Sequence, residues 1–230
     1  MNPSDFDPNQ IILIDKPAGI SSFGVVARVR KYLTVKVGHK VKVGHCGTLD
    51  PFATGLMILV SGKYTKRAGD FSRLKKSYRA TLHLGASSTT LDPEGEIIEL
   101  GNQPIPSLND IEATVASFQG KIKQRPPIFS AIKINGQRAY RLARQGKNID
   151  IDMPLRTVEV YSFKINSYSY PDLDFTVEVS SGTYIRSLGQ DIANQLGTEG
   201  YLTSLRRLSI DSYKVDQAVS LESFNISQHN

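Results

Sequence analysis

Residues 44–55 (GHCGTLDPFATG) contain the side chain best suited to chemistry in this sequence. Glycines and a proline surround one carboxylate, Asp50, between a basic segment and an apolar run. Functional side chains often lie in such a loop when rigid structure supports it. The Asp-Pro pair is also a common turn former. Because a carboxylate surrounded by cations stays ionised, Asp50 suits a nucleophile or base better than an acid.

Other common catalytic and ligand-binding patterns are absent from the sequence. No serine lies in a nucleophile elbow, and no phosphate-binding loop, dinucleotide fingerprint or metal-ligand spacing occurs. The single cysteine, Cys46, excludes an intrachain disulfide and a cysteine-cluster zinc site, and agrees with a reducing compartment. We therefore expect chemistry that needs no cofactor and no metal.

Charged residues are strongly segregated along the chain, whose net charge is +6. Residues 16–49 and 113–149 contain no acid, and Asp70 is the one acid of residues 63–79, whereas residues 80–120 contain no lysine or arginine. Clustered cations are typical of a protein that binds phosphate backbones with salt-sensitive affinity. Solvated helix faces are the alternative, but three acid-poor blocks in one chain favour nucleic acid.

Length and composition indicate an ordinary globular protein. The chain has 230 residues, of which 40% are hydrophobic and 22% charged, which fits a single domain over residues 1–230. No run approaches the ~20 apolar residues of a membrane span, and the first residues lack a targeting pattern. We expect a soluble, cytoplasmic protein.

Hydrophobic periodicity predicts the elements that position these residues. Strands are expected at residues 10–14, 55–61, 77–84, 157–165 and 174–180. Helices are expected after a cap at Ser22, after a capping box formed by Ser107 and Asp110, and over residues 184–196. Strands and helices are mixed without strict alternation. The sequence therefore predicts an α+β fold with a mixed, largely antiparallel sheet and flanking helices.

Residues 121–152 form the best candidate for a protruding insertion. They contain Pro126-Pro127, an Asn135-Gly136 pair and a basic segment ending near Gly146. An Asn-Gly pair is a hairpin signal, although the residues after it favour a helix rather than a returning strand.

Several segments, in order from about residue 11 to 210, together resemble the TruB family of tRNA pseudouridine synthases. They are IDKPAGISSF, GHCGTLDPFATG, KSYRATLHLG, RPPIFSAIKINGQRAYRLARQG, SSGTYIRSLGQDIANQLG and LRRLSI. The resemblance implies the pseudouridine synthase fold with a central RNA-binding cleft. It also implies isomerisation of a uridine in the T loop of tRNA: the bond to uracil N1 is cleaved, the flipped base rotates, and C5 is joined to the ribose.

The same resemblance assigns catalytic roles to three residues. Asp50 would be the catalytic carboxylate, either attacking ribose C1′ or assisting glycal formation. Tyr78 would stack on the extruded uracil and help to deprotonate it, although its strand position also fits the core. Arg186 would pair with Asp50 and fix the carboxylate.

Substrate-binding roles follow in the same way. Leu205 would line the uracil pocket, His45 would hold or replace the flipped nucleotide, and Lys16 and Pro17 would lie in a supporting loop behind the site. Residues 121–152 resemble the thumb that closes on the RNA stem-loop, and the arginines expected to contact RNA there are Arg138, Arg141 and Arg144.

The sequence departs from the family pattern in two places. Thr89 stands where family members commonly have an acidic residue, although Asp92 follows, so RNA contacts there are in question. The chain also stops at Asn230 without the small C-terminal RNA-binding domain of the PUA type that the family usually carries.

The resemblance implies a standalone enzyme whose partner is the T stem-loop of tRNA. We expect a monomer with no membrane association and no obligate protein partner. The alternatives are a non-catalytic RNA-binding or RNA-chaperone protein on the same scaffold, and a guide-dependent isomerase that requires protein partners.

Overall fold

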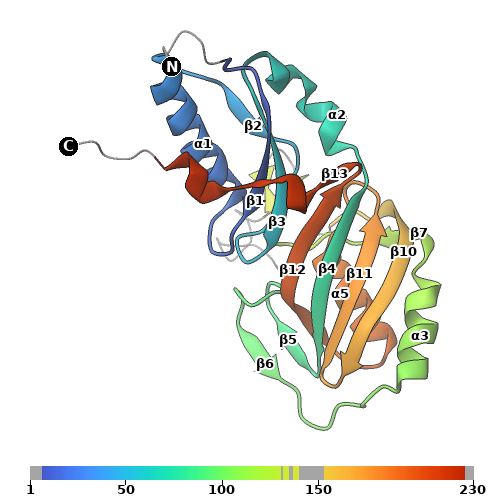
Figure 1. Ribbon diagram of the computed structural model, residues 1–230. Coiled ribbons are helices and arrows are strands. Elements are labelled where there is room, and N and C mark those ends of the chain that lie inside the picture. Colours follow the sequence, from blue (N-terminus) through green and yellow to red (C-terminus); the bar gives the residue numbers. More distant parts are fainter. Residues whose placement is uncertain (1–6, 131, 135–136, 140–152, 226–230) are drawn as a thin grey trace. The chain divides into compact units, whose positions relative to one another are not determined.

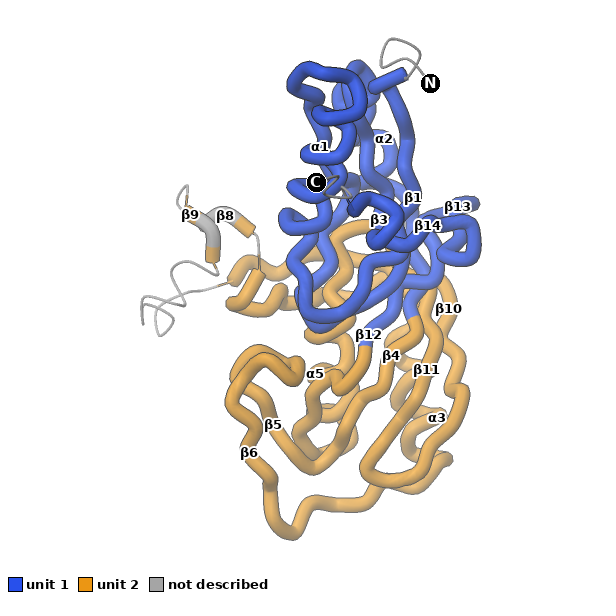
Figure 2. Tube along the Cα trace, turned by 60° about the vertical axis from the view of Figure 1, so that its left-hand side comes forward, with its two compact units in different colours: residues 1–78, 205–230 blue, residues 79–204 orange. Residues whose placement is uncertain are grey.

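The computed structural model describes residues 7–130, 132–134, 137–139 and 153–225 (Figure 1). The chain divides into two compact units (Figure 2). Unit 1 comprises residues 1–78 and 205–230, and unit 2 comprises residues 79–204. The boundary falls inside two strands, β4 (Lys76–Leu84) and β12 (Gly200–Ile210). The expectation of a single domain over the whole chain stays a prediction.

The centre of unit 1 is a pair of antiparallel strands, β1 (Ile11–Lys16) and β3 (Thr54–Ser61). All residues of β3 after the first are buried, as expected of a wholly apolar strand. The unit 1 portion of β12 runs parallel to β3, with Arg206 opposite Thr54.

Short strands complete the sheet of unit 1. β2 (Val43–His45) pairs with β3, and β13 (Tyr213–Lys214) pairs with β12, both antiparallel. β14 (Val219–Ser220) lies parallel to β1. Short helical segments follow β3 and end the described chain, namely Gly62–Arg67, α2 (Ala68–Ser72), Val215–Gln217 and Leu221–Phe224.

Helix α1 (Ser22–Val37) buries the predicted stripe of Val25, Val26, Val29 and Leu33. Its cap is Ser21, whose side chain accepts a hydrogen bond from the Gly24 N–H, so the prediction of Ser22 as the cap is wrong by one residue. The hydroxyl of Ser22 instead bonds the backbone of Leu49. The Ser22 side chain, which the local pattern assigns to the helix cap, therefore bonds a residue far away in the sequence instead.

Unit 2 contains strands in the order β12, β4, β11, β10 and β7. β11 (Asp172–Val179) and β7 (Gly120–Gln124) both pair antiparallel with the long strand β10 (Arg156–Ser169). β4 and β11 alternate buried with partly exposed residues, so one face of this sheet carries the core. A separate hairpin joins β5 (Ala86–Ser88) to β6 (Ile97–Glu99).

The described residues of unit 2 include helices α3 (Leu108–Ser117) and α5 (Ile185–Gln195) (Figure 1). The predicted capping box of Ser107 and Asp110 is present at the start of α3. Gly189 lets α5 approach the sheet closely, because a Cβ there would lie 3.0 Å from Leu202 Cδ2 and 3.2 Å from Leu82 Cδ1.

The candidate insertion contains a two-residue antiparallel pair, β8 (Lys133–Ile134) and β9 (Gln137–Arg138). These strands flank the Asn135-Gly136 pair, so the expectation that no strand returns after it is wrong. Most of the basic segment, residues 140–152, lies outside the described residues.

The fold is α+β, as predicted. Between described strands, β1–β14 and β3–β12 are parallel, whereas β1–β3, β2–β3, β7–β10, β10–β11 and β12–β13 are antiparallel. In the part of the chain that the structure describes, no helix combines the length and hydropathy needed to span a membrane.

Candidate active site

The loop that carries Asp50 lies in unit 1 between β2 and β3, and polar contacts fix its backbone on both sides of the carboxylate. The hydroxyl of Ser22 donates to the Leu49 carbonyl over 2.7 Å and accepts from the Leu49 N–H over 2.8 Å. The carbonyl of Asp50 accepts from the Ala53 N–H over 3.2 Å, which closes a turn. Asp50 is partly exposed, so this rigid loop carries a residue that is not buried in the core.

Lys16 supports the same loop from β1. Its side chain is fully buried, and its ammonium donates to the carbonyls of Pro17, Ile20 and Pro51 over 2.8, 2.8 and 3.0 Å. The Gly19 N–H also donates to the Pro51 carbonyl. Lys16 therefore stabilises the residue that follows Asp50, while Pro17 is exposed. The supporting role of the two residues behind the site stays a prediction.

A second buried cation, Arg207 of β12, holds the loop before Asp50. Its guanidinium donates to the carbonyls of Leu56, Thr48 and Gly47 over 2.6, 3.3 and 3.2 Å, and its side chain is 1% exposed. Gly55 permits this approach, because a Cβ there would lie 2.3 Å from the Arg207 carbonyl oxygen. Sequence reasoning missed Arg207, although it lies in the LRRL segment beside the predicted Leu205.

Lys76 and Cys46 lie near this cation in unit 1. The Lys76 ammonium donates to the carbonyls of Ser72 and Leu74. Burial, reinforced by the charge of Arg207, lowers the pKa of Lys76 to about 8. Burial also raises the pKa of the Cys46 thiol to about 11, so Cys46 stays protonated at neutral pH and is a core side chain.

The remaining predicted residues of unit 1 lie on its strands. Tyr78 of β4 and Leu205 of β12 are each 7% exposed, which fits both the core and the wall of an apolar pocket. His45 ends β2, and its Nδ1 accepts from the Gly47 N–H over 3.4 Å.

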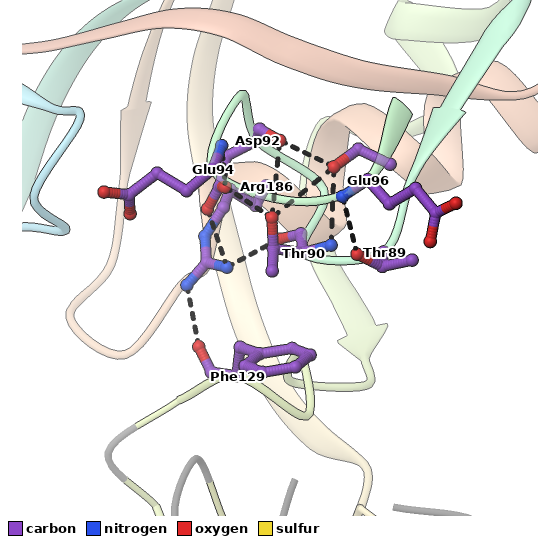
Figure 3. Close-up of polar contacts among 8 residues, drawn as sticks. Thr89, Thr90, Asp92, Glu94, Glu96, Phe129 and Arg186 are labelled. Carbon is purple, nitrogen blue, oxygen red and sulfur yellow. Dashed lines mark hydrogen bonds and ion pairs between the residues drawn. The ribbon is translucent and has the colours of Figure 1, made fainter. Parts of the chain in front are cut away.

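Arg186 is the second residue of α5 in unit 2, and it forms a buried ion pair (Figure 3). Its Nη1 lies 3.1 Å from Asp92 Oδ2, and both side chains are 4% exposed. The guanidinium also donates to the carbonyls of Thr90 and Phe129 over 2.7 and 2.9 Å. Because a buried charge needs both a partner and hydrogen bonds, this set of contacts defines one position for the guanidinium.

The loop between β5 and β6 presents Asp92 to Arg186. The second oxygen of Asp92 accepts from the Thr90 hydroxyl and the Glu94 N–H, and the Asp92 carbonyl accepts from Ser88. Thr89 has a different role, since its N–H and hydroxyl bond the backbone of Glu96 across the hairpin. Asp92 therefore orients Arg186, whereas Thr89 holds the β5–β6 hairpin together.

Gln124 ties the start of α5 to β7. Its side chain is 1% exposed, accepts from the Tyr184 N–H over 2.8 Å and donates to the Tyr184 carbonyl over 3.1 Å. The segment that follows Gln124 therefore starts next to Tyr184, at the beginning of the helix that carries Arg186.

The structure brings some predicted site residues together within a unit. Asp50, Lys16, Pro17, His45, Tyr78 and Leu205 belong to unit 1, and Arg186 and Arg138 belong to unit 2. The pairing of Arg186 with Asp50 stays a prediction. Arg138 lies in β9, and Arg141 and Arg144 lie outside the described residues. Among the described residues, no group of His, Cys, Asp and Glu side chains could hold a metal ion.

The chain is similar to known proteins over most of its length. The chain is 41% identical to a protein named tRNA pseudouridine synthase B from Flavobacterium johnsoniae, over 99% of both chains. It is 42% identical to the protein of the same name from Aquifex aeolicus, over 95% of this chain and 74% of that protein.

A solved structure shares the fold as well. A chain of the structure titled "Crystal Structure of a Cbf5-Nop10-Gar1 Complex" matches with a TM-score of 0.71 and 28% identity, over 96% of this chain and 56% of that chain. The family described as TruB family pseudouridylate synthase (N terminal domain) matches residues 30–185. The chain belongs to the TruB family of pseudouridylate synthases.

Proposed function

We propose that this protein is a tRNA pseudouridine synthase that isomerises a uridine in the T loop of tRNA. The observation that carries the proposal is the 41% identity to a tRNA pseudouridine synthase B over 99% of both chains. The rigidly supported loop around Asp50 adds a physical reason, because a catalytic carboxylate must be held in a reactive position.

Asp50 performs the central chemistry in this proposal. Cleavage of the bond between ribose C1′ and uracil N1 leaves C1′ electron-poor and gives the uracil the bonding electrons. The carboxylate either adds to C1′ or assists loss of a ribose proton to form a glycal. After rotation, uracil C5 bonds to C1′ while the carboxylate–C1′ bond breaks, or while the glycal regains its ribose proton. A base removes the C5 proton, and uracil N1 takes up a proton. Hydrogen bonds to the carbonyls of Leu49 and Pro51 hold the backbone on either side of Asp50 in place.

Tyr78 and Leu205 suit the handling of the extruded base. A target uridine must leave its stack, at a cost of a few kcal/mol that contacts in a pocket offset. An aromatic ring that is almost buried on a strand gives a stacking surface at low entropic cost, and its hydroxyl can take part in proton transfer at C5. Leu205 supplies an apolar wall, and His45 contacts the nucleotide or takes its place in the loop.

Arg186 acts as the electrostatic partner of Asp50 in this proposal. Its guanidinium is fixed within unit 2 by Asp92 and two carbonyls, and a planar fork can serve more than one acceptor. A cation that holds Asp50 keeps the carboxylate ionised and oriented for attack.

RNA binding rests on the basic segments. Exposed cations of unit 1 come from α1, from the loop after it and from the segment after β3, namely Arg28, Lys31, Lys36, Lys40, Lys42, Lys63, Lys66, Arg67, Arg73 and Lys75. Phosphate contacts of this kind position RNA without reading its sequence. In the proposal, Arg138, Arg141 and Arg144 of unit 2 contact RNA as well.

The direct test is incubation of the purified protein with unmodified tRNA, followed by chemical mapping of pseudouridine. The expected result is one new pseudouridine in the T loop, formed without added cofactor, metal or guide RNA. Tight tRNA binding without any pseudouridine would support the non-catalytic RNA-binding alternative instead, and activity that needs a guide RNA would support the guide-dependent one.

A further inference from the structure

Ser130 is a buried polar residue whose hydroxyl finds no hydrogen-bond partner in the part of the chain that the structure describes. Its side chain is 5% exposed, and among the described residues none offers its Oγ a donor or an acceptor. Its backbone is satisfied, since the Ser130 N–H donates to the Ile128 carbonyl over 2.9 Å. Buried hydroxyls almost always find a partner, because an unmade hydrogen bond costs free energy that folding does not recover. A bound molecule that reaches this hydroxyl would therefore supply a hydrogen bond that the described residues do not.

The position of Ser130 connects this hydroxyl to the candidate active site. Ser130 directly follows Phe129, whose carbonyl accepts from Arg186 Nη2 over 2.9 Å (Figure 3). Consecutive Cα atoms lie about 3.8 Å apart, so Ser130 lies beside the guanidinium that Asp92 holds. Gln124 anchors the beginning of the same segment to Tyr184, at the start of α5.

The segment is also built to hold one conformation. Pro126 and Pro127 restrict the backbone between Gln124 and Phe129, and the Arg125 guanidinium donates to the Met153 carbonyl over 2.9 Å. Together with the Arg186 bond to the Phe129 carbonyl, these contacts hold the backbone that leads to Ser130. A fixed hydroxyl loses little entropy when it makes a hydrogen bond, which is the property of a good recognition group.

We propose that the Ser130 hydroxyl contacts the RNA substrate, donating its proton to an acceptor oxygen at or beside the target uridine. This inference rests on the proposed function, because it takes the bound molecule to be RNA. Two sources carry the acceptor: a carbonyl of the uracil, and a phosphate oxygen flanking the target. A serine hydroxyl donates one proton and accepts through two lone pairs, so it fits either source.

The test compares Ser130→Ala with wild-type protein in two measurements. If the hydroxyl is unpaired in the free protein, its removal leaves the thermal unfolding midpoint Tm unchanged within about 1 °C, or raises it. The same change lowers kcat/KM for unmodified tRNA by about 5- to 100-fold, because the acceptor on the RNA loses its partner. Removal of a hydroxyl with a purely structural role would give the opposite result: Tm would fall, and kcat/KM would stay near the wild-type value.

Ser117→Ala is the matched control. Ser117 of α3 donates to the Thr114 carbonyl over 2.7 Å and accepts from Gln195 over 3.0 Å, so its loss lowers Tm and leaves kcat/KM at the wild-type value. If Ser130→Ala behaves like this control, or keeps full activity, the inference is wrong. Asp50→Asn, measured in parallel, separates this failure from failure of the proposed function. If Asp50→Asn is inactive and Ser130→Ala is fully active, the Ser130 contact is refuted and the proposed function stands.

Modified RNA distinguishes the two sources of the acceptor. A stem-loop with 4-thiouridine or 2-thiouridine at the target weakens one uracil acceptor, and a methylphosphonate beside the target removes a phosphate acceptor. At the contacted oxygen, the modification slows the wild-type protein but has little further effect on Ser130→Ala, because the two changes remove the same bond. Full additivity of Ser130→Ala with every modification would contradict a direct contact.

Discussion

Buried cations bound to carbonyl oxygens are the residues that fix the loop carrying Asp50. Lys16 donates to the carbonyls of Pro17, Ile20 and Pro51, and Arg207 donates to those of Gly47, Thr48 and Leu56. Of these residues, Gly47, Thr48 and Pro51 lie within three positions of Asp50 in the sequence. The sequence indicates Asp50 through its glycines, its proline and the surrounding cations. It does not indicate Arg207, because nothing in the LRRL segment distinguishes a solvated arginine from one that crosses the core to reach carbonyls.

Lys76 gives unit 1 a pH dependence with a definite sign. Its pKa is about 8 in the folded protein and 10.5 as the ordinary value, so between these values the unfolded chain binds more protons than the folded one. The free energy of unfolding contributed by Lys76 therefore rises as pH increases from about 8 to 10.5. Arg207 and Cys46 are the neighbouring titratable groups.

Chemical denaturation of wild-type protein and Lys76→Met across this pH range measures that contribution. The wild-type minus variant difference in unfolding free energy should grow with pH. A difference that stays flat or shrinks would mean that the Lys76 ammonium is held charged by the Ser72 and Leu74 carbonyls.

Asp92 should be as important as the residues assigned from the sequence. Asp92→Asn keeps the volume but leaves Arg186 as a buried cation without its carboxylate. Breaking a buried pair in this way costs about 3–5 kcal/mol, so both the unfolding free energy and the single-turnover rate should fall. Asp174→Asn is the matched control, because its partner Arg79 is 60% exposed and such pairs contribute about 0–1 kcal/mol. Equal losses in the two variants would refute a special role for the Asp92–Arg186 pair.

Among the secondary-structure elements, the sequence predicts the features that depend on neighbouring residues but misses a strand that depends on distant ones. The stripe of α1 and the capping box of α3 are set by neighbours within a few residues, and both are present. β12 was not predicted, because its threonine, serine and arginine residues break the alternation typical of a strand. Its neighbours in the sheet, β3 and β4, are far away in the sequence, and only its last residues pair locally, with β13. A local window therefore misses most of the cause.

The junction between α1 and the Asp50 loop depends on one hydroxyl. Ser22→Ala removes both hydrogen bonds to Leu49 and leaves a buried N–H and carbonyl unpaired, at about 1–3 kcal/mol for each group. Stability and kcat should both fall, while tRNA affinity stays within a few-fold. The control is the adjacent Ser21→Ala, which loses the α1 cap at a cost of about 1 kcal/mol and should keep kcat. Unfolding curves with single-turnover kinetics measure both effects; a kcat loss as large in Ser21→Ala would mean that the helix, not the loop contact, controls the site.

For the molecule as a whole, segregated charge predicts how RNA binds. Replacing Arg138, Arg141 and Arg144 with glutamate should weaken tRNA binding strongly and reduce the dependence of log Kd on log salt concentration, because fewer counterions are released. Binding isotherms at several salt concentrations measure both quantities. Lys164→Glu, on the exposed part of β10, is the control and should change the slope little. An unchanged affinity and slope in the triple variant would remove this segment from the RNA-binding surface.

The central claim is that Asp50 of this chain breaks and remakes the bond between ribose and uracil. The most direct measurement is single-turnover formation of pseudouridine with saturating protein and unmodified tRNA, comparing wild-type protein with Asp50→Asn. Wild-type protein should form one pseudouridine in the T loop. The variant should form none, while its tRNA affinity stays within a few-fold because only the charge is lost. Substantial turnover by Asp50→Asn would contradict the central claim.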